Sequence, residues 1–367
     1  MRVPFFNYPY LFKSREENFI KIFKDVGNRG AYILQKDLFE FEKNLAKYCN
    51  VKYAIGVANG TDAIWLALEA AGIGSGDEVI LSSHTYIATA GAIAFVNATP
   101  IPVECKDDWM IDPESVENAI TEKTKAIIPT QLNGRCCDMD KIRDIADKHG
   151  LIIIEDAAQG LGAKYKGVFA GTMGLAGTIS FYPAKTLGSF GDAGAILTND
   201  QALYDKMRFA RDHGRNDEGE FISWGYNSRL DNLQAAILNY KLDYYDDEVS
   251  RRREIAKLYQ TGLSSIEQLK LPPAPDENNG YFDVYQNYEI WAEKREELRE
   301  FLKEKGVGTL IQWSGQPVHS LKKLGFNMTL PFTDNFFKGC MMIPMNTSLS
   351  NDDVYYVIDC IKEFYSK

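Results

Sequence analysis

The first two thirds of the chain alternate between segments of helical periodicity and short, continuous runs of apolar residues. The run Leu151 to Glu155 is typical of these runs. Continuous apolar runs suit strands buried on both faces, and their alternation with helices predicts an α/β fold with a mostly parallel sheet. We predict strands at 54–57, 78–81, 99–103, 126–129 and 151–155, and helices at 39–48, 61–71, 86–96, 113–120 and 139–149.

Near Leu242 the pattern changes. The segments that follow are richer in charged and aromatic residues, and they form helices, a proline-rich turn and an alternating aromatic run. These segments are 246–259, 271–275, 281–291, 294–305 and 352–365. We therefore predict a large α/β domain with an N-terminal arm over residues 1–245, and a smaller α+β domain over residues 246–367.

Composition excludes several classes of protein. The formal net charge of −10 argues against nucleic-acid binding, which needs a basic surface. The 6 cysteines have no repeated spacing, and the 4 histidines form no zinc motif, so we expect neither a disulfide framework nor a metal site. No secretory leader and no apolar stretch of membrane-spanning length is seen, so we expect a cytoplasmic protein without a membrane partner.

Three segments bring polar residues to the ends of predicted strands, where open α/β sheets bind their ligands. In the first, Ala58-Asn59-Gly60-Thr61, a strand turns through glycine into a helix. Free N–H groups at a helix start favour a phosphate, whereas an ordinary N-cap is the alternative.

The second segment places Asp156 at the end of a strongly apolar strand. A buried carboxylate needs a partner, and a protonated pyridine nitrogen would be one. A structural salt bridge or a helix N-cap explains the same residue equally well.

The third segment carries Lys185 in a loop rich in glycine, Tyr182-Pro183-Ala184-Lys185-Thr186-Leu187-Gly188. An isolated lysine is usually a solvated surface residue. The small and apolar neighbours favour partial burial here, which would lower the pKa of the amine and make it nucleophilic.

In this order and spacing, the three segments resemble the DegT/DnrJ/EryC1/StrS family of nucleotide-sugar aminotransferases, over nearly the whole chain. The resemblance implies a fold-type-I enzyme that uses pyridoxal 5′-phosphate (PLP). It also implies L-glutamate as amino donor, a nucleotide-linked ketosugar as acceptor, and a homodimer with each active site at the subunit interface.

The resemblance also implies roles for individual residues. Lys185 matches the Schiff-base lysine, Asp156 the partner of the pyridine nitrogen, and Gln159 the residue beside the ring hydroxyl. Tyr86 matches the aromatic residue that stacks on the cofactor ring. The phosphate ligands match Gly60, Thr61 and Ser180, together with Asn227, which the neighbouring subunit would supply. Asn227 also suits a simple turn. Candidate substrate contacts are His319, Trp313 and Arg229.

The wording around Lys185 looks like the branch that aminates carbon 3, which favours a dTDP-linked 3-keto-6-deoxyhexose and a role in polysaccharide synthesis, such as that of lipopolysaccharide. Amination at carbon 4 of a dTDP-, UDP- or GDP-sugar is the alternative. Family relatives that dehydrate the sugar carry histidine in place of Lys185, which argues against a dehydratase. A regulatory relative without turnover would not need all of Asp156, Gln159 and Lys185. The loop Gln131 to Met139 departs from the family wording, and its Arg135 suits either a substrate anion or a surface salt bridge.

Overall fold

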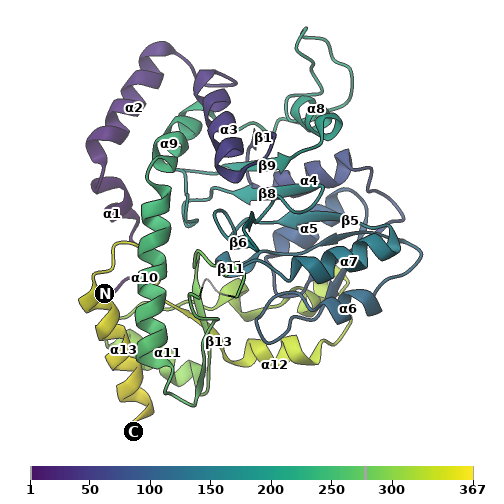
Figure 1. The fold of residues 1–367 in the computed structure, drawn as a ribbon. Coiled ribbons are helices and arrows are strands. Elements are labelled where there is room, and N and C mark those ends of the chain that lie inside the picture. Colours follow the sequence, from purple (N-terminus) through teal and green to yellow (C-terminus); the bar gives the residue numbers. More distant parts are fainter. Residues whose placement is uncertain (1, 277–278, 367) are drawn as a thin grey trace.

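The computed structural model describes residues 2–276 and 279–366. A seven-stranded sheet, in the order β1-β9-β8-β5-β4-β2-β3, forms its centre (Figure 1). Strands β3, β2, β4, β5 and β8 are parallel, and β9 is antiparallel to both its neighbours. The predicted mostly parallel α/β sheet is therefore confirmed. The strands are β1 Tyr53–Val57, β2 Glu78–Ser82, β3 Thr99–Val103, β4 Thr124–Ile128, β5 Ile152–Asp156, β8 Ala176–Ser180 and β9 Gly194–Thr198.

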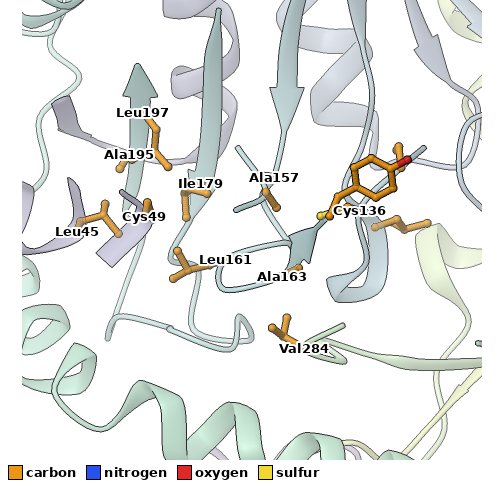
Figure 2. Close-up of a cluster of buried hydrophobic side chains, with 14 of the residues drawn as sticks. Leu45, Cys49, Cys136, Ala157, Leu161, Ala163, Ile179, Ala195, Leu197 and Val284 are labelled. Atoms are coloured by element: carbon orange, nitrogen blue, oxygen red, sulfur yellow. The ribbon is translucent and has the colours of Figure 1, made fainter. Parts of the chain in front are cut away.

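Helices cover both faces of this sheet, because each strand buries apolar side chains on both sides. One buried cluster joins the sheet to α3 Lys36–Cys49, α6 Pro113–Asn118, α7 Met139–His149 and α9 Asn232–Leu242. The other joins it to α4 Gly60–Ala70, α5 Ile87–Phe95 and α8 Gln201–Ala210. Figure 2 shows part of the first cluster, to which Leu45 of α3, Ile179 of β8 and Leu197 of β9 belong.

The C-terminal part has its own buried cluster around the long helix α10. The elements of this C-terminal part are α10 Tyr245–Leu263, α11 Arg295–Glu304, α12 Pro331–Gly339, α13 Asn351–Tyr365, and a small sheet of β10 Leu269–Lys270, β12 Tyr288–Ala292 and β13 Cys340–Ile343. Val3 belongs to this cluster and forms a bridge with Val307, so the first residues pack with the end of the chain. The predicted domain boundary falls at the start of α10, and the division itself stays a prediction.

The remaining elements are short or lie at the edge of the molecule. They are α1 Tyr8–Lys13, α2 Glu16–Arg29, the hairpin β6 Lys164–Tyr165 and β7 Val168–Phe169 with β11 Tyr281–Phe282, and the 3-10 turns η1 Leu132–Gly134, η2 Gln312–Gly315, η3 Val318–Ser320 and η4 Lys322–Leu324. In Figure 1, α1 and α2 stand beside α9 and the upper part of α10. Within the described ranges, no helix is long and apolar enough to cross a membrane.

Candidate active site

A cavity of about 690 Å³ lies where β5 and β8 end and α4 begins. Eight of the eleven residues that sequence analysis proposed for the site line it together, although they come from distant parts of the chain. They are Gly60, Thr61, Tyr86, Asp156, Gln159, Ser180, Lys185 and Trp313. The cavity therefore brings the three predicted segments into one place.

The start of α4 forms the first wall. The Asn59 side chain caps this helix by accepting a hydrogen bond from the N–H of Asp62 at 2.8 Å. Gly60 and Thr61 are the first two helical residues, so their N–H groups have no carbonyl partner inside the helix. A Cβ at Gly60 would lie 2.9 Å from the Cβ of Ser180, so only glycine allows β8 to approach this closely. The helix start beside the Ser180 hydroxyl fits a phosphate group.

Asp156 forms the second wall, at the end of β5, and is 4% exposed. Its carboxylate accepts hydrogen bonds from the Thr89 hydroxyl at 2.7 Å and the Ala158 N–H at 3.2 Å. Burial raises the pKa of this carboxyl, while those hydrogen bonds and the charge of Lys185 act against the rise. In the part of the chain that the structure describes, no cation is hydrogen-bonded to Asp156. A protonated pyridine nitrogen suits such a buried carboxylate.

Lys185 forms the third wall, in the loop between β8 and β9. Burial lowers the pKa of its amine to about 8, and the charge of Asp156 opposes that change. The lowered pKa that the small and apolar neighbours predict is therefore present. An amine with this pKa is partly uncharged at neutral pH, and the uncharged form is the nucleophile that attacks an aldehyde.

Gln159 presents a hydrogen-bond donor to the cavity. Its Oε1 accepts hydrogen bonds from the N–H of Asn133 at 2.8 Å and from the side-chain amide of Asn287 at 3.5 Å. These contacts use the amide oxygen, so the Nε2 group remains for a ligand. A donor here suits the ring oxygen of PLP.

Two aromatic side chains line the same cavity. Tyr86 is the N-cap residue of α5, and Trp313 lies in η2, where it adopts a left-handed backbone conformation with φ of 52°. Their ring centroids are 5.3 Å apart, with the planes at 40°. The flat faces are suited to a planar ring or a sugar.

Asn227 and Arg229 do not line the cavity of their own chain. Both lie in the segment 212–229 that connects α8 to α9. Asn227 is exposed, and Arg229 forms an ion pair with Asp212 at 3.0 Å. The intervening Ser228 donates a hydrogen bond to Asp62, in the first turn of α4, at 2.6 Å. Roles for Asn227 and Arg229 in a neighbouring subunit stay predictions.

His319 is not among the residues that line the cavity, and its predicted contact with the sugar stays a prediction. This residue is 2% exposed and lies outside the cavity. Its Nδ1 lies 2.6 Å from the Ser83 hydroxyl, and its Nε2 lies 3.0 Å from the carboxylate of Asp334. Both ring nitrogens thus have partners, and the contact with Ser83 holds η3 against the loop after β2.

Arg135 is not in a surface salt bridge, nor does it reach the cavity. Its guanidinium forms an ion pair with Asp283 at 2.6 Å, and both side chains are buried. The same group lies 3.9 Å from the ring centroid of Tyr281. The loop Gln131 to Met139 contacts the site through Asn133 instead, whose N–H donates a hydrogen bond to the side-chain oxygen of Gln159.

Sequence reasoning missed two residues that shape this site. Thr89 lies three positions after Tyr86 in the predicted helix, and that spacing puts both on one helix face, so a local signal existed. Asn287 contacts Gln159 from more than a hundred residues away, and no local pattern points to it. Among the residues described, no group of three or more His, Cys, Asp or Glu side chains is arranged to hold a metal ion.

A mostly parallel sheet with a lysine of lowered pKa at its carboxyl edge, opposite a buried carboxylate and a phosphate cradle, is the arrangement of a PLP-dependent enzyme. The chain belongs to the DegT/DnrJ/EryC1/StrS aminotransferase family, whose model matches residues 13–362. Enzymes of this family depend on PLP, and solved structures of them hold it or its pyridoxamine form.

Individual relatives cover nearly the whole chain. A pleiotropic regulatory protein from Geobacillus stearothermophilus is 41% identical, over 100% of this chain and 99% of its own length. The dTDP-3-amino-3,4,6-trideoxy-alpha-D-glucose transaminase of Streptomyces venezuelae is 38% identical, over 99% of this chain and 96% of its own. The solved structure of DesV from S. venezuelae matches with a TM-score of 0.95 at 38% identity, over 100% of this chain and 99% of its own.

Proposed function

We propose that this aminotransferase moves an amino group from L-glutamate to the keto group of a nucleotide-linked sugar, and that its preferred acceptor is a dTDP-linked 3-keto-6-deoxyhexose. The product is an amino sugar that still carries its nucleotide, for use in polysaccharides such as lipopolysaccharide. The observation that carries this proposal is the convergence of Lys185, Asp156 and the Gly60-Thr61 helix start on one cavity.

Bound PLP supplies the aldehyde that accepts the amino group and a ring that withdraws electrons from the donor's α-carbon. In the proposed mechanism the uncharged amine of Lys185 would accept the proton from that α-carbon as general base and would return it as general acid. Asp156 would keep the ring nitrogen protonated, and Gln159 would donate a hydrogen bond to the ring oxygen. Tyr86 would pack on the ring face, and Gly60, Thr61 and Ser180 would hold the phosphate. The lowered pKa of Lys185 supports its part in this scheme.

The choice of carbon 3 has two supports. The wording from Ser180 to Asp192 resembles the branch of the family that aminates carbon 3, and the Streptomyces venezuelae relative bears the name of a 3-amino sugar transaminase. A relative named GDP-perosamine synthase, from Escherichia coli O157:H7, is 38% identical over 350 residues. Other nucleotides and carbon 4 therefore belong in the same experiment. Of the three candidate sugar contacts, Trp313 is the one that lines the cavity, together with the predicted cofactor residues.

We also propose a homodimer in which the segment 212–229 completes the partner's site. Four large hydrophobic side chains in this segment are exposed, and Trp224 is 99% exposed. They are Phe221, Ile222, Trp224 and Tyr226. Clusters of this kind on a single chain usually mark a protein interface. Ser228 holds the neighbouring Asn227 close to the phosphate cradle of its own chain, so a two-fold axis near this point would bring it to the partner's phosphate.

The proposal is tested by incubating the purified, PLP-loaded chain with L-glutamate and a panel of dTDP-, UDP- and GDP-linked 3- and 4-ketosugars. Products are identified by mass spectrometry and nuclear magnetic resonance. We expect 2-oxoglutarate and a 3-amino sugar, formed fastest from the dTDP-linked 3-ketosugar. Loss of water from the sugar without amination would indicate a dehydratase. Absence of turnover with every acceptor would favour a regulatory role, as in the name of the Geobacillus relative.

A further inference from the structure

Gln286 lies in the turn between β11 and β12, and it is 5% exposed. Its side chain reaches the loop that carries Lys185, although the two residues are about a hundred positions apart. The Nε2 group donates a hydrogen bond to the carbonyl of Ala184 at 2.8 Å. The Oε1 atom accepts a hydrogen bond from the N–H of Thr186 at 2.7 Å. One side-chain amide thus bonds the residues on both sides of Lys185.

The turn that carries Gln286 is itself fixed. Arg252, a buried residue of α10, donates hydrogen bonds to the carbonyls of Tyr285, Gln286 and Met345 at 3.1, 3.2 and 3.0 Å. Tyr285 adopts a left-handed conformation with φ of 50°, which turns the chain toward the loop. Gln286 therefore holds the Lys185 loop from a rigid support, because its own backbone is held by a guanidinium.

The same turn also contacts the ring-oxygen side of the cavity. Asn287 donates hydrogen bonds to the side-chain oxygens of Asn133 at 3.0 Å and Gln159 at 3.5 Å. Two adjacent residues of one turn thus contact the Lys185 loop and the Gln159 amide, on two sides of the cofactor cavity.

The ends of the loop around Lys185 are held by other hydrogen bonds, from the Ser189 N–H to the Phe181 carbonyl at 2.8 Å and from Lys241 to the Gly188 carbonyl at 2.5 Å. The two peptide groups next to Lys185 have fewer constraints besides Gln286. The Lys185 N–H donates to the Tyr182 carbonyl at 2.8 Å, and the Thr186 hydroxyl lies 2.7 Å from that of Tyr245. Residues 181–193 form no strand that would hold the peptide groups in a ladder. Rotation of either peptide next to Lys185 would move the end of a long, flexible side chain, so the position of Nζ depends on the two bonds from Gln286.

We propose that Gln286 is a positioning residue that holds both peptide groups next to Lys185 and thereby keeps the lysine amine aligned for proton transfer. This inference rests on the proposed role of Lys185. Gln286 does not line the cofactor cavity, and it would act through the lysine.

Two variants and a matched control test it. Gln286→Met keeps the length of the side chain and removes both hydrogen bonds, whereas Gln286→Glu keeps the acceptor for Thr186 and loses the donor to Ala184. Gln260→Met is the control, because Gln260 of α10 accepts one hydrogen bond from the Tyr288 hydroxyl at 3.3 Å, away from the loop. Melting temperatures separate losses of overall stability from changes at the loop.

The first measurement is amide hydrogen exchange of peptides covering residues 182–189 in the cofactor-free protein. We expect Gln286→Met to exchange at least about tenfold faster there, because the N–H of Thr186 loses its acceptor. Gln286→Glu should remain closer to the wild type at this N–H, and Gln260→Met should match the wild type. Unchanged exchange in Gln286→Met would overturn the positioning role, whether or not the chain binds PLP.

The second measurement uses the PLP-loaded enzyme. We expect Gln286→Met to lower kcat about 10- to 100-fold, with a smaller change in KM, because a displacement of about 1 Å at the amine is enough for such a loss. The isotope effect with L-glutamate deuterated at the α-carbon should increase, since proton transfer becomes slower than the other steps. A kcat and an isotope effect equal to those of Gln260→Met would contradict the proposal. A wild-type chain that does not bind PLP at all would instead overturn the proposed function.

Discussion

The walls of the cofactor cavity and the segment 212–229 differ in how completely one chain builds them. The cavity walls are the end of β5, the start of α4 and the loop that carries Lys185. All the polar residues that line them come from one chain. The segment 212–229 lies on the surface, with Trp224 at 99% exposure and Asn227 facing solvent. A single folded chain therefore brings together all the predicted cofactor residues except Asn227, whose proposed role needs a second copy.

Two lysines make the same contrast on a smaller scale. Burial lowers the pKa of both Lys185 and Lys241 to about 8. Lys241 donates a hydrogen bond to the Gly188 carbonyl at 2.5 Å and does not line the cofactor cavity, whereas Lys185 lines it. Burial alone thus does not distinguish the two lysines; we predict Lys185 as the cofactor anchor because of its position beside Asp156 and the start of α4. Lys241 is the natural control for Lys185.

The largest expected effect is that of Lys185→Met. It removes both the covalent anchor and the group that moves the proton, so we expect transamination to fall by at least about 10²- to 10⁴-fold, the usual contribution of a general acid–base group. Steady-state kinetics with L-glutamate measures the loss. Lys241→Met should keep the covalent link and most of the activity. Equal losses in the two variants would show that burial, rather than position, determines which lysine matters.

Asp156→Asn is expected to have the next largest effect. The amide keeps the size of the side chain but removes the charge that holds the ring nitrogen protonated, so turnover should fall roughly 100-fold. PLP should still bind, because the phosphate cradle is unchanged. Stopped-flow kinetics of the half-reaction with L-glutamate gives the rate, and equilibrium dialysis gives the PLP affinity. A rate within twofold of the wild type would argue that Asp156 is only a structural residue.

The pH dependence of PLP attachment follows from the lowered pKa of Lys185. Only the uncharged amine attacks the aldehyde, so the attachment rate should rise about tenfold per pH unit below the pKa and level off above about pH 8. Stopped-flow absorbance after mixing the cofactor-free chain with PLP measures this profile. An attachment rate that continues to rise toward pH 10 would indicate a solvated lysine of ordinary pKa.

Asn227→Ala is expected to have the smallest effect. Loss of one hydrogen bond to a charged phosphate, roughly 1.5 kcal/mol, should weaken PLP binding about tenfold. A mixed dimer of Lys185→Met and Asn227→Ala chains sharpens the test, because a shared site would then be intact once in each mixed dimer. Refolding an equal mixture should restore about a quarter of the wild-type sites. Failure to recover tight PLP binding in the mixture would mean that Asn227 does not serve a partner.

Local signals explain what the sequence predicted well. The helix predicted at 139–149 is α7, Met139–His149, because Asp138 caps its start and Gly150, at φ of 64°, ends it. The bounds of strands β1 to β5 agree with the predictions to within two residues at each end, since each strand contains a short run of apolar residues. Gly60, Asp156 and Lys185 could be singled out from the sequence because each lies at the end of an apolar strand or in the loop that follows one.

Contacts between distant segments explain what the sequence did not predict. Strand β9 pairs antiparallel between β1 and β8, and no local pattern gives that order. The contacts of His319 with Ser83 and Asp334 join three distant segments, and no local pattern points to them. The hold of Gln286 on the Lys185 loop spans about a hundred positions and likewise has no local signature.

The most direct test of the central claim is to locate the covalent link. The PLP-loaded chain is reduced with borohydride, digested, and analysed by mass spectrometry. We expect a single pyridoxyl group, on Lys185, in the peptide that also contains Tyr182 and Thr186. A label on Lys241, or no label at all, would contradict the account.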